Sequence, residues 1–186
     1  MRAGRAVAFV LVALWAGQSI GAAPADFGPD GYRTARYRAP VGIDPAPAGH
    51  IALAAALMLD PKRDALFIDV LPVEGGVREA ASGRWRLSER HVTIPGARWH
   101  PETGRDPVDP VLWRGLEAEV RRARARQPGI PVVLFCRSDC WMSWNAARRL
   151  AAAGHADIWW LAEGTDGWHD AGRELVEIQP VAIPGR

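Results

Sequence analysis

The sequence predicts an α/β domain with a central, mostly parallel sheet flanked by helices. Short, continuously apolar segments such as ALFIDVLP (65–72) and IPVVLF (130–135) are typical of strands that are buried on both faces. Longer segments with helical periodicity separate them. A helix between two strands returns the chain to the same end of the sheet, so this alternation favours parallel pairing.

Helices and strands alternate along most of the chain. Helices are expected at 51–60, 109–127 and 143–154, and strands at 65–72, 93–99, 130–135 and 156–161, with the strand at 93–99 broken by Pro95-Gly96. The clearest helix has Asp109 at its N-cap, Pro110 in its first turn and arginines at its C-terminal end, where they complement the helix dipole. The segment AEGTDGWHDAG (162–172) is expected to be a loop.

Residues 1–25 have the pattern of a secretory signal peptide. Arg2 and Arg5 come first, about a dozen apolar residues follow, and small residues suit cleavage between 22 and 25. The apolar run is shorter than the roughly 20 residues that span a bilayer. We therefore expect export to the periplasm, with no membrane attachment after cleavage. Residues 26–49, rich in proline, glycine and arginine, are expected to form an extended or partly disordered arm, and residues 50–186 the folded domain.

The charge balance argues against a nucleic-acid partner. The full chain has 23 basic and 21 acidic residues, and cleavage of the signal peptide removes two arginines and no acid. The mature chain is thus about neutral. It has no basic tract interleaved with aromatic residues, the pattern that a nucleic-acid surface needs.

Both cysteines of the chain lie in PVVLFCRSDCWMSW, residues 131–144. Cys136 ends a predicted strand, and a predicted helix follows. Ligands of open α/β sheets lie beyond the carboxyl ends of the strands, and the first N–H groups of a helix favour a thiolate. The sequence therefore predicts Cys136 as a nucleophile of low pKa. At this spacing the Cα atoms of Cys136 and Cys140 lie about 6 Å apart in a turn, which is within disulfide range.

Three interpretations of the pair stay open: a thiol-active centre, an inert local bridge, and a metal site. A Cu(I) site would use Cys136, Cys140 and Met142, because copper(I) prefers soft sulfur ligands, with His91, His100 or His169 approaching from other loops. Zinc is disfavoured because four good ligands cannot be named. No other cofactor is expected.

Several side chains are expected around the mouth of the cysteine site. Asp69, Glu163 and Asp166 follow or approach strand ends, where a carboxylate can take a proton from a thiol, hold the loop by hydrogen bonds, or simply cap a turn. Trp141 and Trp144 flank the cysteines. They either pack in the core under the loop or shape an apolar surface on which a flat ligand stacks.

Four segments resemble, in order, motifs of the rhodanese-like superfamily: LFIDVLP, IPGARW, CRSDCW and GHADIWWLAEGTDGWHDAG. The resemblance extends over residues 51–176. It implies a three-layer fold with a central, mostly parallel sheet flanked by helices. It also implies that Cys136 holds the position at which sulfurtransferases carry sulfur as a persulfide, and that Trp168 closes the last loop.

The segments CWMSWNAA and WLAEGTDGW, with the arm sequence GYRTARYRAPV, are similar to a narrower group. These are the CXXCW-motif proteins associated with catabolism that depends on pyrroloquinoline quinone (PQQ). That resemblance implies an accessory role in quinoprotein alcohol oxidation, with the dehydrogenase or its electron acceptor as partner. Three residues separate the cysteines here, Arg137, Ser138 and Asp139, where the name of the group indicates two.

The cysteine loop differs from that of an active sulfurtransferase. The family loop returns to an arginine that helps to bind the anionic donor, but Cys140, Trp141 and Met142 occupy that end here, and Arg137 is the only cation. Cys140 would also capture a persulfide or sulfenic acid on Cys136 by forming a disulfide. The resemblance thus favours a thiol/disulfide or sulfur-handling centre. The alternative is a non-catalytic binding or maturation module, with Cu(I) binding through the cysteine pair as one option for it, and sulfur transfer from thiosulfate is disfavoured.

Overall fold

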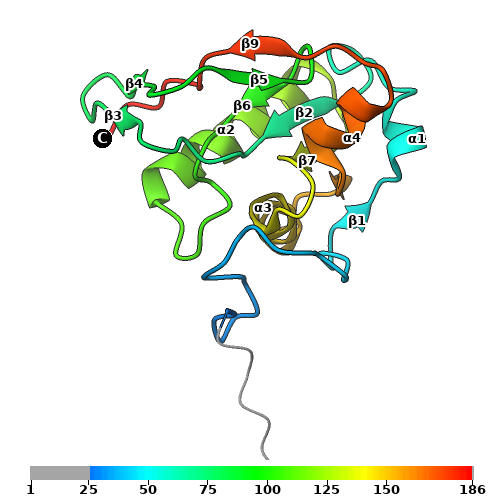
Figure 1. Ribbon diagram of the computed structural model, residues 1–186, viewed down its shortest axis with the longest axis horizontal. Helices are drawn as coiled ribbons and strands as arrows, with labels where there is room; N and C mark the ends of the chain where they lie inside the picture. The colour runs from blue at the N-terminus through cyan, green and yellow to red at the C-terminus, as the bar shows by residue number, and fades with distance from the viewer. Residues whose placement is uncertain (1–25, 186) are drawn as a thin grey trace, which may run out of the picture.

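A five-stranded parallel sheet forms the centre of the fold, with strand order β1-β8-β7-β2-β6 (Figure 1). The computed structural model describes residues 26–185, so the expected signal peptide lies outside the described residues. The sheet strands are β1 (Gly49–His50), β2 (Leu66–Asp69), β6 (Arg98–Trp99), β7 (Val132–Phe135) and β8 (Ile158–Trp160). This sheet, flanked by helices, confirms the predicted fold class.

Two small antiparallel sheets and four helices complete the described chain. The first small sheet pairs β3 (Val77–Arg78) with β4 (Trp85–Arg86), and the second pairs β5 (His91–Thr93) with β9 (Val176–Ile178). The helices are α1 (Leu53–Ala56), α2 (Pro110–Arg126), α3 (Trp141–Ala152) and α4 (Gly164–Asp170). No helix within residues 26–185 is long and apolar enough to cross a bilayer.

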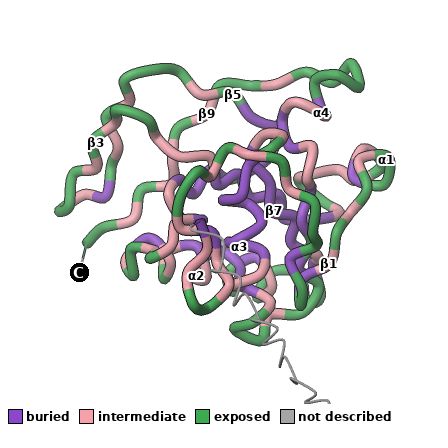
Figure 2. Tube along the Cα trace, turned by 60° about the horizontal axis from the view of Figure 1, so that its bottom comes forward, coloured by how far each residue is buried: buried purple, intermediate pink, exposed green. Residues whose placement is uncertain are grey.

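Each face of the central sheet is covered by a hydrophobic core. Successive side chains of a strand point to opposite faces. Leu66 and Ile68 of β2 accordingly pack with residues of α2 and α3, whereas Phe67 packs with residues of α1 and α4. Because both faces are covered, all four residues of β2 and all four of β7 are buried, as their apolar sequences predicted (Figure 2).

Three predicted elements differ in the structure. The prediction of a loop at 162–172 is wrong, because residues 164–170 form the helix α4. The segment is rich in glycine, but Trp168 is buried against Phe67, and this packing compensates for its low helix propensity. The helix expected at 51–60 shortens to four residues. The strand expected at 93–99 is broken at Pro95-Gly96, as predicted, but its two parts, β5 and β6, belong to different sheets.

The arm at 26–49 crosses α3 before it joins the central sheet as β1. Asn145 of α3 accepts a hydrogen bond from the Arg33 N–H (2.9 Å) and donates one to the Arg33 carbonyl (2.8 Å). The Trp144 Nε1–H donates to the carbonyl of Ile43 at 2.8 Å. These contacts hold the backbone of the arm against the helix that follows the cysteines.

His100, which directly follows β6, is fully buried, and neither ring nitrogen has a hydrogen-bond partner among residues 26–185. Burial lowers its pKa from 6.5 to about 4, with Glu119 opposing the shift and Arg98 and Arg122 adding to it. The imidazole is therefore neutral in the folded protein at neutral pH.

The protein is expected to lose stability as the pH falls through this range. The unfolded chain binds a proton at His100 near pH 6.5, whereas the folded chain binds it only near pH 4. The free energy of unfolding should therefore drop by about 3 kcal/mol between these two values. Urea titrations at a series of pH values measure this loss. In His100→Gln this pH-dependent drop in the free energy of unfolding should vanish. In His155→Gln, which replaces a partly exposed histidine, it should persist. If the free energy of unfolding of His100→Gln falls with pH as steeply as that of the wild type, the loss of stability is not due to His100.

Candidate functional site

The cysteine loop, residues 136–140, joins β7 to α3 and is closed by a disulfide between its two ends. The Cα atoms of Cys136 and Cys140 lie 6.5 Å apart, as the spacing predicted. Asp139 has φ = +55°, a left-handed conformation that aspartate tolerates better than most residues. This residue turns the chain so that Cys140 comes back beside Cys136.

A backbone bridge holds each end of this loop. On one side, the amide of Ala39 in the arm donates to the carbonyl of Asp139 (2.9 Å), and the amide of Trp141 donates to the carbonyl of Tyr37 (2.8 Å). On the other side, the amide of Thr165 in α4 donates to the carbonyl of Cys136 at 2.9 Å. Segments far apart in the sequence thus fix the loop from both sides.

A polar network lies beside the Cys136 sulfur. The Ser143 Oγ is 3.4 Å from the Cys136 Sγ and 3.2 Å from the Cys140 carbonyl, to which it donates. The Trp160 Nε1–H donates to this same oxygen at 3.0 Å. Since Trp160 supplies a proton of its own, the Ser143 proton is free to turn toward a sulfur that becomes anionic.

Both sulfurs are covered. Cys136 is 1% exposed and Cys140 is 6% exposed, so the pair lies at the edge of the core and not in the open mouth that the sequence suggested. The N-terminus of α3 also differs from the prediction that its first N–H groups face a thiolate. Cys140 is the N-cap of α3, and the first N–H of that helix, on Trp141, is donated to the arm. A thiolate at Cys136 would therefore depend on Ser143 more than on the helix terminus.

The three expected carboxylates have three different environments. Asp166 accepts hydrogen bonds from the N–H (3.2 Å) and the hydroxyl (2.6 Å) of Ser138, and so holds the loop. The Oε2 of Glu163 is buried without a partner among the described residues. Asp69 accepts from the amide of Leu71 (2.8 Å) and lies 2.7 Å from both His91 Nε2 and Thr93 Oγ1. Of the three, only Asp166 is hydrogen-bonded to the cysteine loop.

A cavity of about 130 Å³ lies beside the loop at the carboxyl ends of the strands. Arg137 of the loop, His91 and Trp99 line it, and the His91 ring stacks on Trp99 with centroids 4.0 Å apart. Neither cysteine lines this cavity. Arg137 is therefore the loop side chain placed to meet a ligand there, with His91 oriented by Asp69 across from it.

Sequence reasoning missed part of this arrangement. Ser143 lies three residues after Cys140, one helical turn along α3, and this spacing could have indicated its contact with the loop. The contact between Asp69 and His91 has no local signal, because it depends on how β5 lies against β2. The hydrogen bond between the Trp141 amide and the Tyr37 carbonyl likewise has no local signal in the sequence.

The tryptophans beside the cysteines pack in the core. Trp141 and Trp144 are buried, with ring centroids 5.3 Å apart, and Phe27 of the arm packs edge-on against Trp141. The guanidinium of Arg33 covers the same ring at 5.0 Å. Of the two interpretations of these tryptophans, the structure thus favours core packing under the arm over an open surface for a flat ligand. Trp168, expected in the last loop, is buried in α4.

As a disulfide, the pair offers no thiolate to a metal. Met142 is fully buried, and within residues 26–185 no group of three histidine, cysteine or acidic side chains is arranged to hold an ion. Copper binding through Cys136 and Cys140 thus requires the reduced pair, and it stays a prediction.

Comparison with known proteins yields one domain family. The family model described as the Rhodanese-like domain matches residues 53–171, more than half of the chain and including the whole cysteine loop. A search of curated proteins and a search of solved structures each find no match. The arm lies outside the matched region.

Gly164 is expected to be essential to the contact between α4 and the loop. It has φ = +55°, and a Cβ at this position would lie 2.4 Å from the carbonyl oxygen of Cys136. Gly164→Ala should therefore lower the free energy of unfolding by about 2–4 kcal/mol, through backbone strain and overpacking together. Chemical denaturation measures the loss.

Gly154→Ala is the matched control. Gly154 also has a positive φ (+87°), but a Cβ there would meet no atom within 4 Å. In this variant only backbone strain should lower the free energy of unfolding, by about 1–2 kcal/mol. Equal losses in the two variants would show that the close approach of Gly164 to the loop is unimportant.

Proposed function

Because the chain belongs to the rhodanese-like domain family, we propose that its Cys136–Cys140 pair is a thiol/disulfide centre of an exported protein that serves a PQQ-dependent alcohol-oxidising system. The observation that carries the proposal is the disulfide itself. By the resemblance, it blocks the cysteine that would carry a persulfide. While the bond is intact, Cys136 cannot accept sulfur, and the available chemistry is thiol–disulfide exchange.

The exchange starts at Cys140, the less buried of the two residues (6% exposed against 1% for Cys136). A thiolate of a partner protein attacks the Sγ of Cys140, the bond to Cys136 breaks, and Cys136 leaves as a thiolate. A second partner thiol then attacks the mixed disulfide and releases Cys140. The partner is oxidised to a disulfide, the pair takes up two electrons, and the protons of the partner thiols protonate the released thiolates.

Ser143 stabilises the leaving sulfur. Its hydroxyl donates to the carbonyl of Cys140 in the oxidised form and lies 3.4 Å from the Cys136 Sγ. When Cys136 becomes anionic, the hydroxyl can turn to it while Trp160 continues to donate to the Ser143 oxygen. A hydrogen bond to the anion stabilises the Cys136 thiolate and thereby favours the reduced pair.

Burial determines which thiols can react. Both cysteines are buried, and the arm and α4 hold the two ends of the loop by backbone hydrogen bonds. A partner must therefore displace part of the loop before it reaches Cys140. This requirement favours a protein partner that binds the loop over a free small thiol.

The export and the partner are supported by the sequence. The arm and the tryptophan-rich helix after Cys140 resemble the PQQ-associated CXXCW group, and a disulfide persists in an oxidising compartment such as the periplasm. We propose the quinoprotein dehydrogenase or its electron acceptor as the partner.

Growth of the native host on an alcohol tests the role of the pair. Strains that carry Cys136→Ser or Cys140→Ser should grow slowly on an alcohol whose oxidation requires the quinoprotein, and normally on succinate. Immunoblotting confirms equal protein levels, which separates a lost reaction from a lost fold. Full growth of the Cys136→Ser strain on the alcohol would refute the proposal.

Ser143→Ala should make the pair more reducing. Loss of one hydrogen bond to the Cys136 thiolate costs about 1 kcal/mol, which corresponds to a reduction potential lower by roughly 20 mV for a two-electron couple. Equilibration with glutathione buffers, followed by alkylation and mass spectrometry, measures this shift. The control is Thr165→Val, since the Thr165 hydroxyl contacts the carbonyl of Cys136 and not its sulfur. A potential that is the same in Ser143→Ala and wild type would remove Ser143 from the mechanism.

A further inference from the structure

A groove of about 480 Å³ lies at the opposite end of the central sheet from the cysteine loop. It is formed by the C-terminal half of α2 and by the residues where β2 and β6 begin, so it lies at the amino ends of these strands. Its volume is within the range of small-molecule sites. No residue of the cysteine loop takes part in it.

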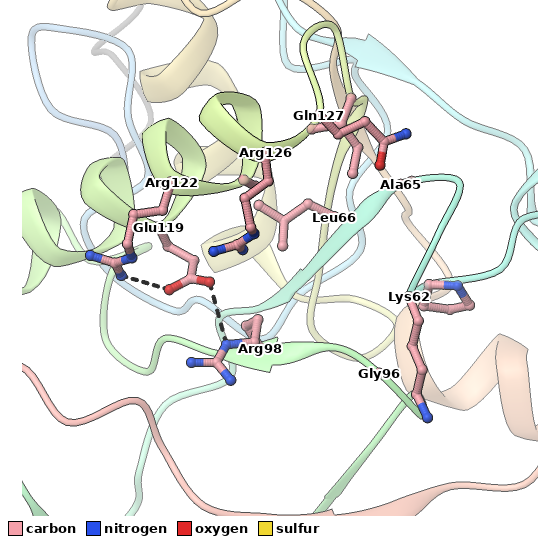
Figure 3. A pocket seen from close by; sticks show the side chains of 12 residues that line it. Lys62, Ala65, Leu66, Gly96, Arg98, Glu119, Arg122, Arg126 and Gln127 are labelled. Carbon is pink, nitrogen blue, oxygen red and sulfur yellow. Dashed lines mark hydrogen bonds and ion pairs between the residues drawn. The ribbon is translucent and has the colours of Figure 1, made fainter.

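The charged side chains of the groove are mostly positive. Lys62, Arg98, Arg122 and Arg126 line it together with a single acid, Glu119 (Figure 3). This excess of positive charge is local, because the chain as a whole has a formal net charge of only +2. A groove with this balance attracts anions and repels cations.

Glu119 holds two of the guanidinium groups in place. Its carboxylate is 2.7 Å from the Arg122 Nη2 and 3.5 Å from the Arg98 Nε, and its side chain is only 7% exposed. Burial raises the pKa of Glu119, but the hydrogen bond from Arg122 and the charge of Arg98 outweigh this effect and lower it overall. The carboxylate thus stays ionised and presents both arginines, each half-exposed, to the groove.

The other two cations differ from Arg98 and Arg122, because no acidic side chain among residues 26–185 forms an ion pair with them. Arg126 and Lys62 form no ion pair within the part of the chain that the structure describes, and both are exposed. Figure 3 shows Arg126 beside the Arg98–Glu119–Arg122 cluster and Lys62 across the groove from these arginines. The groove therefore has two separate positive ends, with apolar atoms of Leu66 in its wall.

We propose that this groove binds a small anion with two or more charged oxygen-bearing groups, either an oligophosphate or a polycarboxylate. One group lies against the guanidinium groups of Arg126 and its neighbours, which offer paired donors to planar or tetrahedral oxyanions. The other meets the ammonium of Lys62. A singly charged anion contacts only one end and binds more weakly. The site is independent of the disulfide, so Cys136→Ser leaves it intact.

Lys62 offers a specific probe, because it is the only lysine of the chain. Reductive ¹³C-methylation of the intact protein keeps its charge and gives one side-chain NMR signal. The labelled N-terminal amine is recognised separately, because it titrates near pH 8. Pyrophosphate and citrate are titrated at low ionic strength, with acetate as the singly charged comparison. The Lys62 signal should shift saturably with pyrophosphate, citrate or both, and only weakly with acetate. The anion that binds more tightly identifies the class of ligand, an oligophosphate for pyrophosphate and a polycarboxylate for citrate.

Variants of two arginines on α2 complete the test. Arg126→Gln should raise the Kd about tenfold, and Arg126→Lys less. Arg121→Gln, which removes an exposed charge outside the groove, should change the Kd far less. Two results would overturn the proposal: no saturable shift with either anion at millimolar concentration, or binding that Arg126→Gln and Arg121→Gln weaken equally.

Discussion

The cysteine loop is held in place by backbone hydrogen bonds to two segments that are distant in the sequence. Tyr37 and Ala39 of the arm bind one side, and the first turn of α4 binds the other. The disulfide closes the loop between them. The family match begins at residue 53, so the arm, one of the two segments that hold the loop, lies outside the matched domain. The arm therefore belongs structurally to the site that it covers.

This arrangement explains why the site differs from an open sulfurtransferase pocket. Phe27 and Arg33 pack on Trp141, and both cysteines are buried. The neighbouring cavity is reached by Arg137 but not by either cysteine. Movement of the loop would break the backbone hydrogen bonds to the arm and to α4, so the same contacts that hold the loop limit access to the disulfide.

The two ends of the central sheet have different chemical character. The carboxyl ends of β2 and β7 lead to Asp69 and to the disulfide, both buried. The amino ends lead to a groove of positive charge organised by Glu119. In a parallel sheet all strands share these two ends, so residues from separate segments gather at each of them. The fold can therefore carry two independent sites.

The sequence by itself determined the features that depend on local pattern. The apolar runs of β2 and β7 predict strands buried on both faces, and Asp109 with Pro110 marks the start of α2, because capping acts within one turn. The spacing of the two cysteines is likewise local, and it predicts Cα atoms close enough for a disulfide, but it leaves open whether the bond forms.

Only the tertiary structure decided the features that depend on distant partners. The helix α4 forms because Trp168 packs against Phe67, the Asp69 carboxylate is held by His91, and the cysteine loop is hydrogen-bonded to the arm. Each of these joins residues more than 20 positions apart. Local propensity carries no information about such contacts, since their free energy arises only when the whole core is assembled.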